Sequence, residues 1–247
     1  MKTFISMLKI EGKLSVRDMN MIIFALIMPV VVLVIQGIIY GQNKAFAGAN
    51  YSSIEQSFGA LCSIAICAGG LMGLPIVISD YRERKILKRF QVTPVSPVMI
   101  LLVEVVIYTI YSLLSVIFLW VVAVLFFGFV FHGSWLLFFG GWFLVLSSML
   151  GIGMLVGGIA KNSKQASLIA SILYFPMLIF SGATLPYEVM PVGLQMAVNM
   201  MPLTQGIKIL KATVLGLPME NVLIPIVSIV ALTLLCIVGS IRFFRWE

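Results

Sequence analysis

Six long runs of apolar residues, separated by short polar segments, organise the chain. Each run holds about twenty residues, enough for a helix to cross the ~30 Å hydrocarbon core of a bilayer. The pattern therefore predicts an all-α integral membrane protein with six transmembrane helices, numbered here as spans 1 to 6. Their expected ranges are 21–40, 58–79, 98–127, 135–160, 165–181 and 222–241.

Small residues indicate where two of these spans pack closely. Span 2 contains Gly69-Gly70-x-x-Gly73, and span 4 contains Gly153-x-x-x-Gly157. Glycines at such spacings allow helix backbones to approach each other. Span 1 contains Pro29, and we expect a kink there because proline lacks the N–H of a regular helix.

Residues 1–20 mix apolar and basic positions before span 1. Phe4, Ile5 and Leu8 lie on one side of a helix, while Lys9 and Lys13 lie elsewhere. This pattern is typical of an amphipathic helix that lies in the membrane interface. We expect the segment to be an interfacial helix.

The most charged segment, residues 80–97, separates spans 2 and 3. Asp80 can cap a short helix, with Glu83 three residues later as its capping-box partner. Thr93-Pro94 ends this helix, because proline disfavours helical geometry in the residue before it. A helix with this charge cannot enter the bilayer, so we expect it to lie on the membrane surface or to dock into another protein.

Residues 182–221 are too apolar for an ordinary loop and are interrupted by prolines. Pro191 and Pro202 each stand where the first position of a helix is expected. Ile207, Leu210 and Val214 follow a helical period in the second piece. We expect two short re-entrant helices that enter the outer leaflet and are shielded by the spans, because lipid does not tolerate unpaired backbone.

Composition and charge agree with a single membrane domain over residues 1–247. Hydrophobic residues make up 61% of the chain and charged residues 10%, far from the balance of a soluble domain. Of the 16 Lys and Arg residues, 13 fall in segments on one side if the N-terminus is cytoplasmic. The positive-inside rule then places both termini and the charged helix in the cytoplasm. It also explains the net charge of +7 without a nucleic-acid partner.

Residues that could perform chemistry are scarce. The chain has no phosphate-binding loop, no hydrolase motif and no metal-ligand spacing, so we expect neither enzyme activity nor a bound cofactor or metal on this chain. Glu104 is the one carboxylate expected inside a span. It either faces a neighbouring helix or inner water, or it has a direct role in substrate contact or gating. His132 lies in an outer turn without an evident ligand partner.

Several short motifs follow one another along the chain. They are Arg89-Phe90-Gln91-Val92-Thr93-Pro94-Val95-Ser96, Phe175-Pro176, Ser181-Gly182, Leu185-Pro186, Met190-Pro191 and Met201-Pro202-Leu203-Thr204. Together with the six spans, the order and spacing of these motifs resemble the ABC-2 type transporter permeases, and most closely the short drug- and antibiotic-resistance exporters. The resemblance covers the whole chain. Members of this family often have a glycine inside the charged helix, where this chain has Arg84-Lys85-Ile86.

The resemblance implies a dimer of permeases, each bound to a separate ABC ATPase that carries the ATP and Mg²⁺. The charged helix would be the coupling helix that docks into the ATPase, with Ile86, Leu87 and Phe90 in an apolar cleft. Alternatively, the helix lies on anionic lipid headgroups. The implied coupling residues are Asp80, Arg82, Glu83, Arg84, Lys85, Ile86, Leu87, Lys88, Arg89, Phe90, Thr93 and Pro94.

The same resemblance implies a substrate path between the two permeases and an outer gate. Path candidates on span 5 are Ser171, Tyr174, Phe175 and Leu178, although ordinary helix packing also explains the aromatic ones. Gate candidates are Gly182, Pro186, Pro191 and Pro202.

The sequence thus predicts a plasma-membrane exporter subunit that moves an amphiphilic drug, antibiotic, peptide or lipid-like compound outward. One alternative is a permease for a polysaccharide or teichoic acid. Another is an immunity or sensor subunit that transports nothing.

Overall fold

The structure is a computed structural model that describes residues 2–40, 43–45, 49–91, 96–181 and 191–243. These residues form helices and no strand, and six of the helices are long and apolar enough to cross a membrane. The predicted all-α membrane fold is therefore confirmed. The predicted ranges agree with the observed spans to within about two residues, except for span 2.

Two of the six spans contain π-helical turns. Span 1 comprises α2 (Met19–Ile22), the π-turn η1 (Ile23–Ile27) and α3 (Met28–Tyr40). Span 2 comprises α4 (Ser53–Cys67), the π-turn η2 (Ala68–Gly73) and α5 (Leu74–Glu83), so it is longer than predicted at both ends. In span 1 the widened turn ends two residues before Pro29, which cannot donate a helical hydrogen bond.

The other spans are single helices, and four further helices lie around them. Spans 3 to 6 are α7 (Pro97–Phe127), α8 (Trp135–Ile159), α9 (Ser163–Phe180) and α12 (Leu223–Phe243). The shorter helices are α1 (Lys2–Ser15), α6 (Ile86–Gln91), α10 (Val192–Asn199) and α11 (Pro202–Leu215), with the 3-10 turn η4 (Met219–Val222) before span 6.

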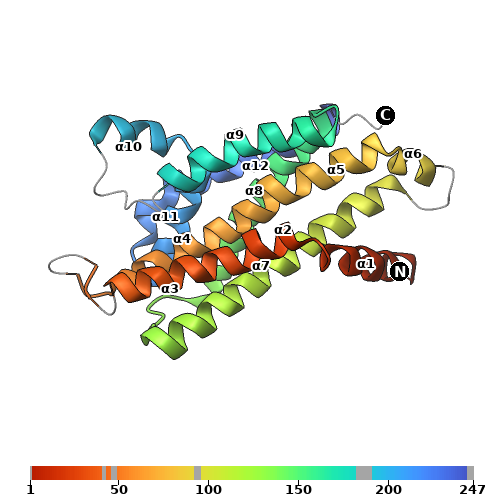
Figure 1. Cartoon of the computed structure of the whole chain (residues 1–247). Helices are drawn as coiled ribbons and strands as arrows, with labels where there is room; N and C mark the ends of the chain where they lie inside the picture. The colour runs from red at the N-terminus through yellow and green to blue at the C-terminus, as the bar shows by residue number, and fades with distance from the viewer. Residues whose placement is uncertain (1, 41–42, 46–48, 92–95, 182–190, 244–247) are drawn as a thin grey trace.

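The spans lie side by side and define two ends of the bundle (Figure 1). One end holds α1, α6, the α8–α9 turn and the end of α12, and we call it the basic end. The opposite end, here the far end, holds the α3–α4 and α7–α8 connections together with α10 and α11. An even number of spans brings the start of α1 and the end of α12 to the same end.

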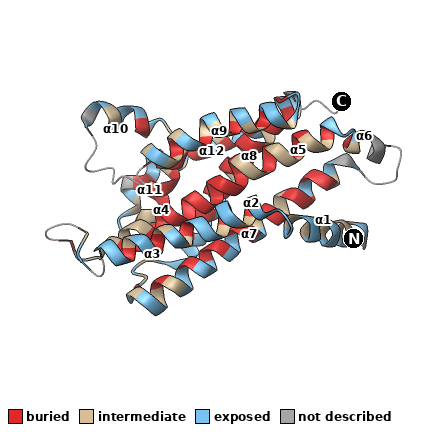
Figure 2. Ribbon diagram, in the orientation of Figure 1, coloured by how far each residue is buried: buried red, intermediate tan, exposed pale blue. Residues whose placement is uncertain are grey.

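Span 2 forms the centre of the bundle. In the most apolar 18-residue stretch of span 2, 78% of the residues are buried, whereas 22% are buried in the corresponding stretch of span 1. Span 4 and α11 are the other extensively buried helices, and the remaining spans surround them (Figure 2). The core is therefore organised around spans 2 and 4.

Glycines bring the backbones of spans 2 and 4 into direct contact. A Cβ atom at Gly153 would lie 1.9 Å from the carbonyl oxygen of Gly70, and one at Gly70 would lie 2.8 Å from Met149. Only glycine fits such an approach. The close packing expected from the two glycine motifs is confirmed.

The second proline-bounded helix is part of the core. Helix α11 packs against α4, α8 and α12, and its predicted stripe of Ile207, Leu210 and Val214 is buried. Pro202 occupies its first turn as expected. Pro191, however, is the N-cap of α10 and not its first helical residue, which corrects the prediction by one position.

We expect Gly153→Ala to destabilise the protein by about 1–3 kcal/mol, because the added methyl group forces the backbones of spans 2 and 4 apart. Thermal unfolding of the detergent-purified chain would measure the effect. Gly140→Ala is the matched control on the same helix, since nothing lies within 4 Å of a Cβ there. Equal melting temperatures for the two variants would contradict the packing described here.

Candidate functional site: the coupling turn and the apolar strip

The charged segment between spans 2 and 3 contains a sharp turn. Helix α5 continues from span 2 to Glu83, and α6 begins at Ile86. Lys85, between them, has a φ of 55°, a left-handed conformation that side chains with a Cβ adopt rarely and glycine adopts easily. We call residues 84–91 the coupling turn.

Asp80 does not cap this helix, contrary to the prediction. It lies inside α5, where its carboxylate accepts a hydrogen bond from Arg84 Nε at 2.9 Å. No residue between Ser79 and Glu83 interrupts the helix, so the backbone bonds of span 2 continue as far as Arg84 N–H to Asp80 C=O. Glu83 accordingly has no capping-box role.

Arg82 and Glu83 instead attach the basic end of span 2 to the neighbouring spans. Arg82 is 7% exposed and donates through Nη1 to the Gly158 carbonyl of span 4 at 2.7 Å. Glu83 accepts from the backbone N–H of Ser163 at 2.9 Å and from its hydroxyl at 2.8 Å, which caps the start of span 5. Arg82 therefore supports the turn from inside the bundle, whereas Glu83 is exposed and joins the turn to span 5 at the surface.

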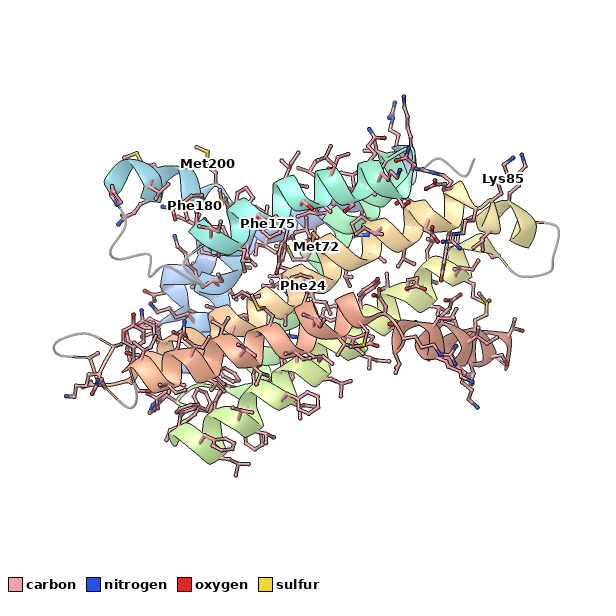
Figure 3. The ribbon with its side chains drawn as sticks, viewed as in Figure 1. Phe24, Met72, Lys85, Phe175, Phe180 and Met200 are labelled. Atoms are coloured by element: carbon pink, nitrogen blue, oxygen red, sulfur yellow. The ribbon has the colours of Figure 1, made fainter. Side chains whose placement is uncertain are left out.

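The apolar side of α6 also differs from the prediction. Leu87 is fully buried where α6 packs near α5 and α7, so it holds α6 in place and cannot fill a cleft on another protein. Ile86 is half-buried. The cations Arg84, Lys85 and Lys88 are exposed, and Figure 3 shows Lys85 beyond the last turn of α5. The side chains of Arg89 and Phe90, and the residues Thr93 and Pro94, lie outside the described part of the chain.

The N-terminal helix joins the same region. Glu11 of α1 accepts a hydrogen bond from the Tyr81 hydroxyl of α5 at 2.6 Å, and that hydroxyl lies 3.2 Å from Glu104 of span 3. Of the three apolar residues predicted on one side of α1, Phe4 and Leu8 pack against the core, whereas Ile5 is exposed. Glu104 thus faces neighbouring helices, one of the two alternatives left open by the sequence.

The four path candidates on span 5 differ in how far their side chains are buried. Tyr174 is 1% exposed, so it is a core residue in this conformation. Phe175 is 47% exposed. Ser171 and Leu178 are half-buried. The sequence alone could not separate Tyr174 from Phe175, because both lie on one apolar helix.

Apolar side chains from three spans lie on one face of the bundle. Figure 3 shows Phe24 of η1, Met72 of η2 and Phe175 of α9 across this face, and η2 contacts both η1 and α9. Phe24 is exposed and Met72 is half-buried. We call these three residues the apolar strip. Phe24 and Met72 were absent from the sequence prediction, since hydropathy does not tell which side of a span stays uncovered.

At the far end, the gate candidates are only partly described. Gly182 and Pro186 lie outside the described residues, Pro191 is exposed and Pro202 is half-buried. Lys208 of α11 donates to the Asn199 side chain at the end of α10, and partial burial lowers the pKa of its ammonium group. This bond fixes α10 to α11.

Glu55 is a buried carboxylate at the far end that was not among the predicted site residues. Glu55 is 7% exposed, forms a capping box with Ser52 and accepts a hydrogen bond from the Val130 N–H. Its Oε1 atom lies 3.2 Å from His132 Nε2, so this histidine does have a partner. The Ser52-x-x-Glu55 spacing is the capping-box signature and could have predicted the start of span 2.

These features define a multi-pass helical membrane protein with a cationic turn anchored beneath its central span. The family model for ABC-2 type transporters matches residues 2–215. The chain belongs to the ABC-2 type transporter family, in which it is a membrane permease and not itself a catalytic subunit.

One curated protein, Nodulation protein J of Rhizobium leguminosarum bv. viciae, is 32% identical to the chain over 71 residues. These residues are 29% of the chain and 27% of that protein. The match spans about a quarter of the relative's length and is too local to carry over a substrate.

We expect Arg82→Ala to lower stability by about 2 kcal/mol, because a buried charged hydrogen bond to span 4 is lost. Arg84→Ala is the matched control, since the Arg84 side chain is 70% exposed and its ion pair with Asp80 contributes little. Thermal unfolding in detergent would compare the two. A larger loss in the Arg84 variant would contradict the assignment of Arg82 as the anchor.

Proposed function

We propose that this chain is the membrane-spanning subunit of an ABC exporter that moves an amphiphilic compound out of the cell. Family membership and the cationic coupling turn support the proposal. The turn follows directly from the central span and is anchored to spans 4 and 5 through Arg82 and Glu83. A force applied to α6 would therefore reach the core of the bundle without crossing a flexible linker.

The energy would come from a separate ABC ATPase that binds ATP and Mg²⁺. The exposed Arg84, Lys85 and Lys88 give the coupling turn a positive surface, which would steer and orient a partner of opposite charge. Phe90 remains our candidate for the apolar anchor in the ATPase cleft. Leu87 does not fit the role of an anchor in the ATPase, because it is buried within its own chain.

The apolar strip supports an amphiphilic substrate. Phe24, Met72 and Phe175 offer apolar surface from three spans, and aromatic and thioether side chains adapt to varied apolar ligands. A second permease facing this strip would enclose a path between the two chains. An exporter of polar polymers would need polar groups along such a path, which these three residues do not provide.

The proposed orientation places the basic end in the cytoplasm and the far end outside the plasma membrane. The excess of Lys and Arg at the basic end is the support for this orientation.

The docking proposal predicts that Arg84→Glu/Lys85→Glu weakens binding of the ATPase by about tenfold or more, since two attractive charges become repulsive. The measurement is co-purification of the ABC ATPase with tagged permease, followed by ATP-driven uptake of a fluorescent amphiphile into inverted vesicles.

Lys44→Glu is the control for that experiment, because Lys44 is exposed in the connection between α3 and α4, away from the coupling turn. Retention of the ATPase by the Arg84/Lys85 variant at the level of the Lys44 variant would contradict docking at the coupling turn. ATP hydrolysis by the purified chain alone would contradict the proposal that a separate subunit hydrolyses ATP.

The orientation predicts that Met200→Cys reacts with membrane-impermeant maleimide in intact cells, whereas Lys161→Cys reacts only after the cells are opened. Met200 is 87% exposed at the far end, and Lys161 is exposed in the α8–α9 turn. The native Cys62, Cys67 and Cys236 are buried and provide a low background. Labelling of Lys161→Cys in intact cells would reverse the proposed topology.

A further inference from the structure

Three oxygen-bearing side chains from three different helices meet at the basic end. The Tyr81 hydroxyl of α5 lies 2.6 Å from Oε2 of Glu11 on α1 and 3.2 Å from Oε1 of Glu104 on α7. Glu104 is 4% exposed, and Glu11 and Tyr81 are partly buried. The arrangement is a chain of two carboxyl groups joined through one phenol.

The two contacts require a second proton if both are hydrogen bonds. The phenol has a single O–H, yet its oxygen lies within hydrogen-bond distance of a carboxyl oxygen of Glu11 and of one of Glu104. One of the two carboxyl groups must then be protonated and donate to the phenol oxygen. Glu104 is the more deeply buried of the two, at 4% exposed, so its ionised form is the costlier one and it is the group that gains most from holding the proton.

The burial of Glu104 also favours its neutral form. Its neighbours Glu11 and Tyr81 are acidic and phenolic, and Tyr108, one helical turn later on α7, is a buried phenol. Asp18, beyond the end of α1, is exposed, as are Lys9 and Lys13 of α1 and Lys88 of α6. Burying an ionised carboxylate is costly, and taking up a proton removes that cost.

We propose that Glu104 binds a proton in the folded protein and that this proton completes a hydrogen-bond chain from Glu104 through Tyr81 to Glu11. Tyr81 is a positioning residue, because it orients both carboxyl groups. These hydrogen bonds link α1 to spans 2 and 3 at Tyr81, one residue before Arg82, which attaches span 2 to span 4. A displacement of α5 that separates Tyr81 from Glu104 would expose the carboxyl group, which would then release its proton to water.

The test compares the full wild-type chain with Glu104→Gln in detergent at neutral pH. The glutamine amide can donate to Tyr81 as a protonated carboxyl group does, so the variant should fold and melt as the wild type does in mild acid. The infrared difference spectrum, wild type minus variant, should contain the C=O band of a protonated carboxylic acid. Glu220→Gln, at an exposed acidic position, is the control and should lack this band.

The pH dependence of stability provides a second readout. A proton bound in the folded state and released on unfolding makes the unfolding equilibrium constant rise by up to about tenfold per pH unit as the pH increases. The wild type should show this rise relative to Glu104→Gln. A carboxylate band alone in the difference spectrum, failure of Glu104→Gln to fold, or parallel pH profiles for the two proteins would each overturn the proposal.

Discussion

The backbone contact between spans 2 and 4 is the constraint on which the rest of the structure depends. A bundle in lipid gains little from the hydrophobic effect between its helices, so close van der Waals packing has to hold the spans together. Gly70 and Gly153 allow that packing at the centre of the molecule. Helix α11 then completes the core at the far end, and spans 1, 3, 5 and 6 surround it.

The position of the glycines also explains the irregular helix in span 2. Gly69, Gly70 and Gly73 fall within the π-turn η2, where the backbone is wider than in an α-helix. Tyr108 of span 3 packs on the same turn, since a Cβ at Gly73 would lie 2.4 Å from its ring. The π-turn η2 therefore contacts span 4 on one side and span 3 on another, and it also contains Met72 of the apolar strip.

Hydropathy predicted the six spans well because each apolar run has to match the thickness of the bilayer. It could not predict contacts made across the bundle. The local pattern assigns Asp80 a capping role and the family resemblance assigns Leu87 a docking role. Span 2 instead continues through Asp80, and Leu87 is buried where α6 packs near α5 and α7. Tyr174 illustrates the same limit, whereas the Ser52-x-x-Glu55 signature does indicate from the sequence where span 2 begins.

Three consecutive residues bind the basic end of span 2 to neighbouring helices in three directions. Successive positions of an α-helix point about 100° apart, because a turn contains 3.6 residues. Tyr81 therefore reaches α1, Arg82 reaches span 4, and Glu83 reaches the start of span 5. The coupling turn begins at the next residue. A movement of α6 would consequently be passed through α5 to α1, span 4 and span 5. The wider π-turn η2 is where span 2 is least constrained by regular α-helical hydrogen bonds.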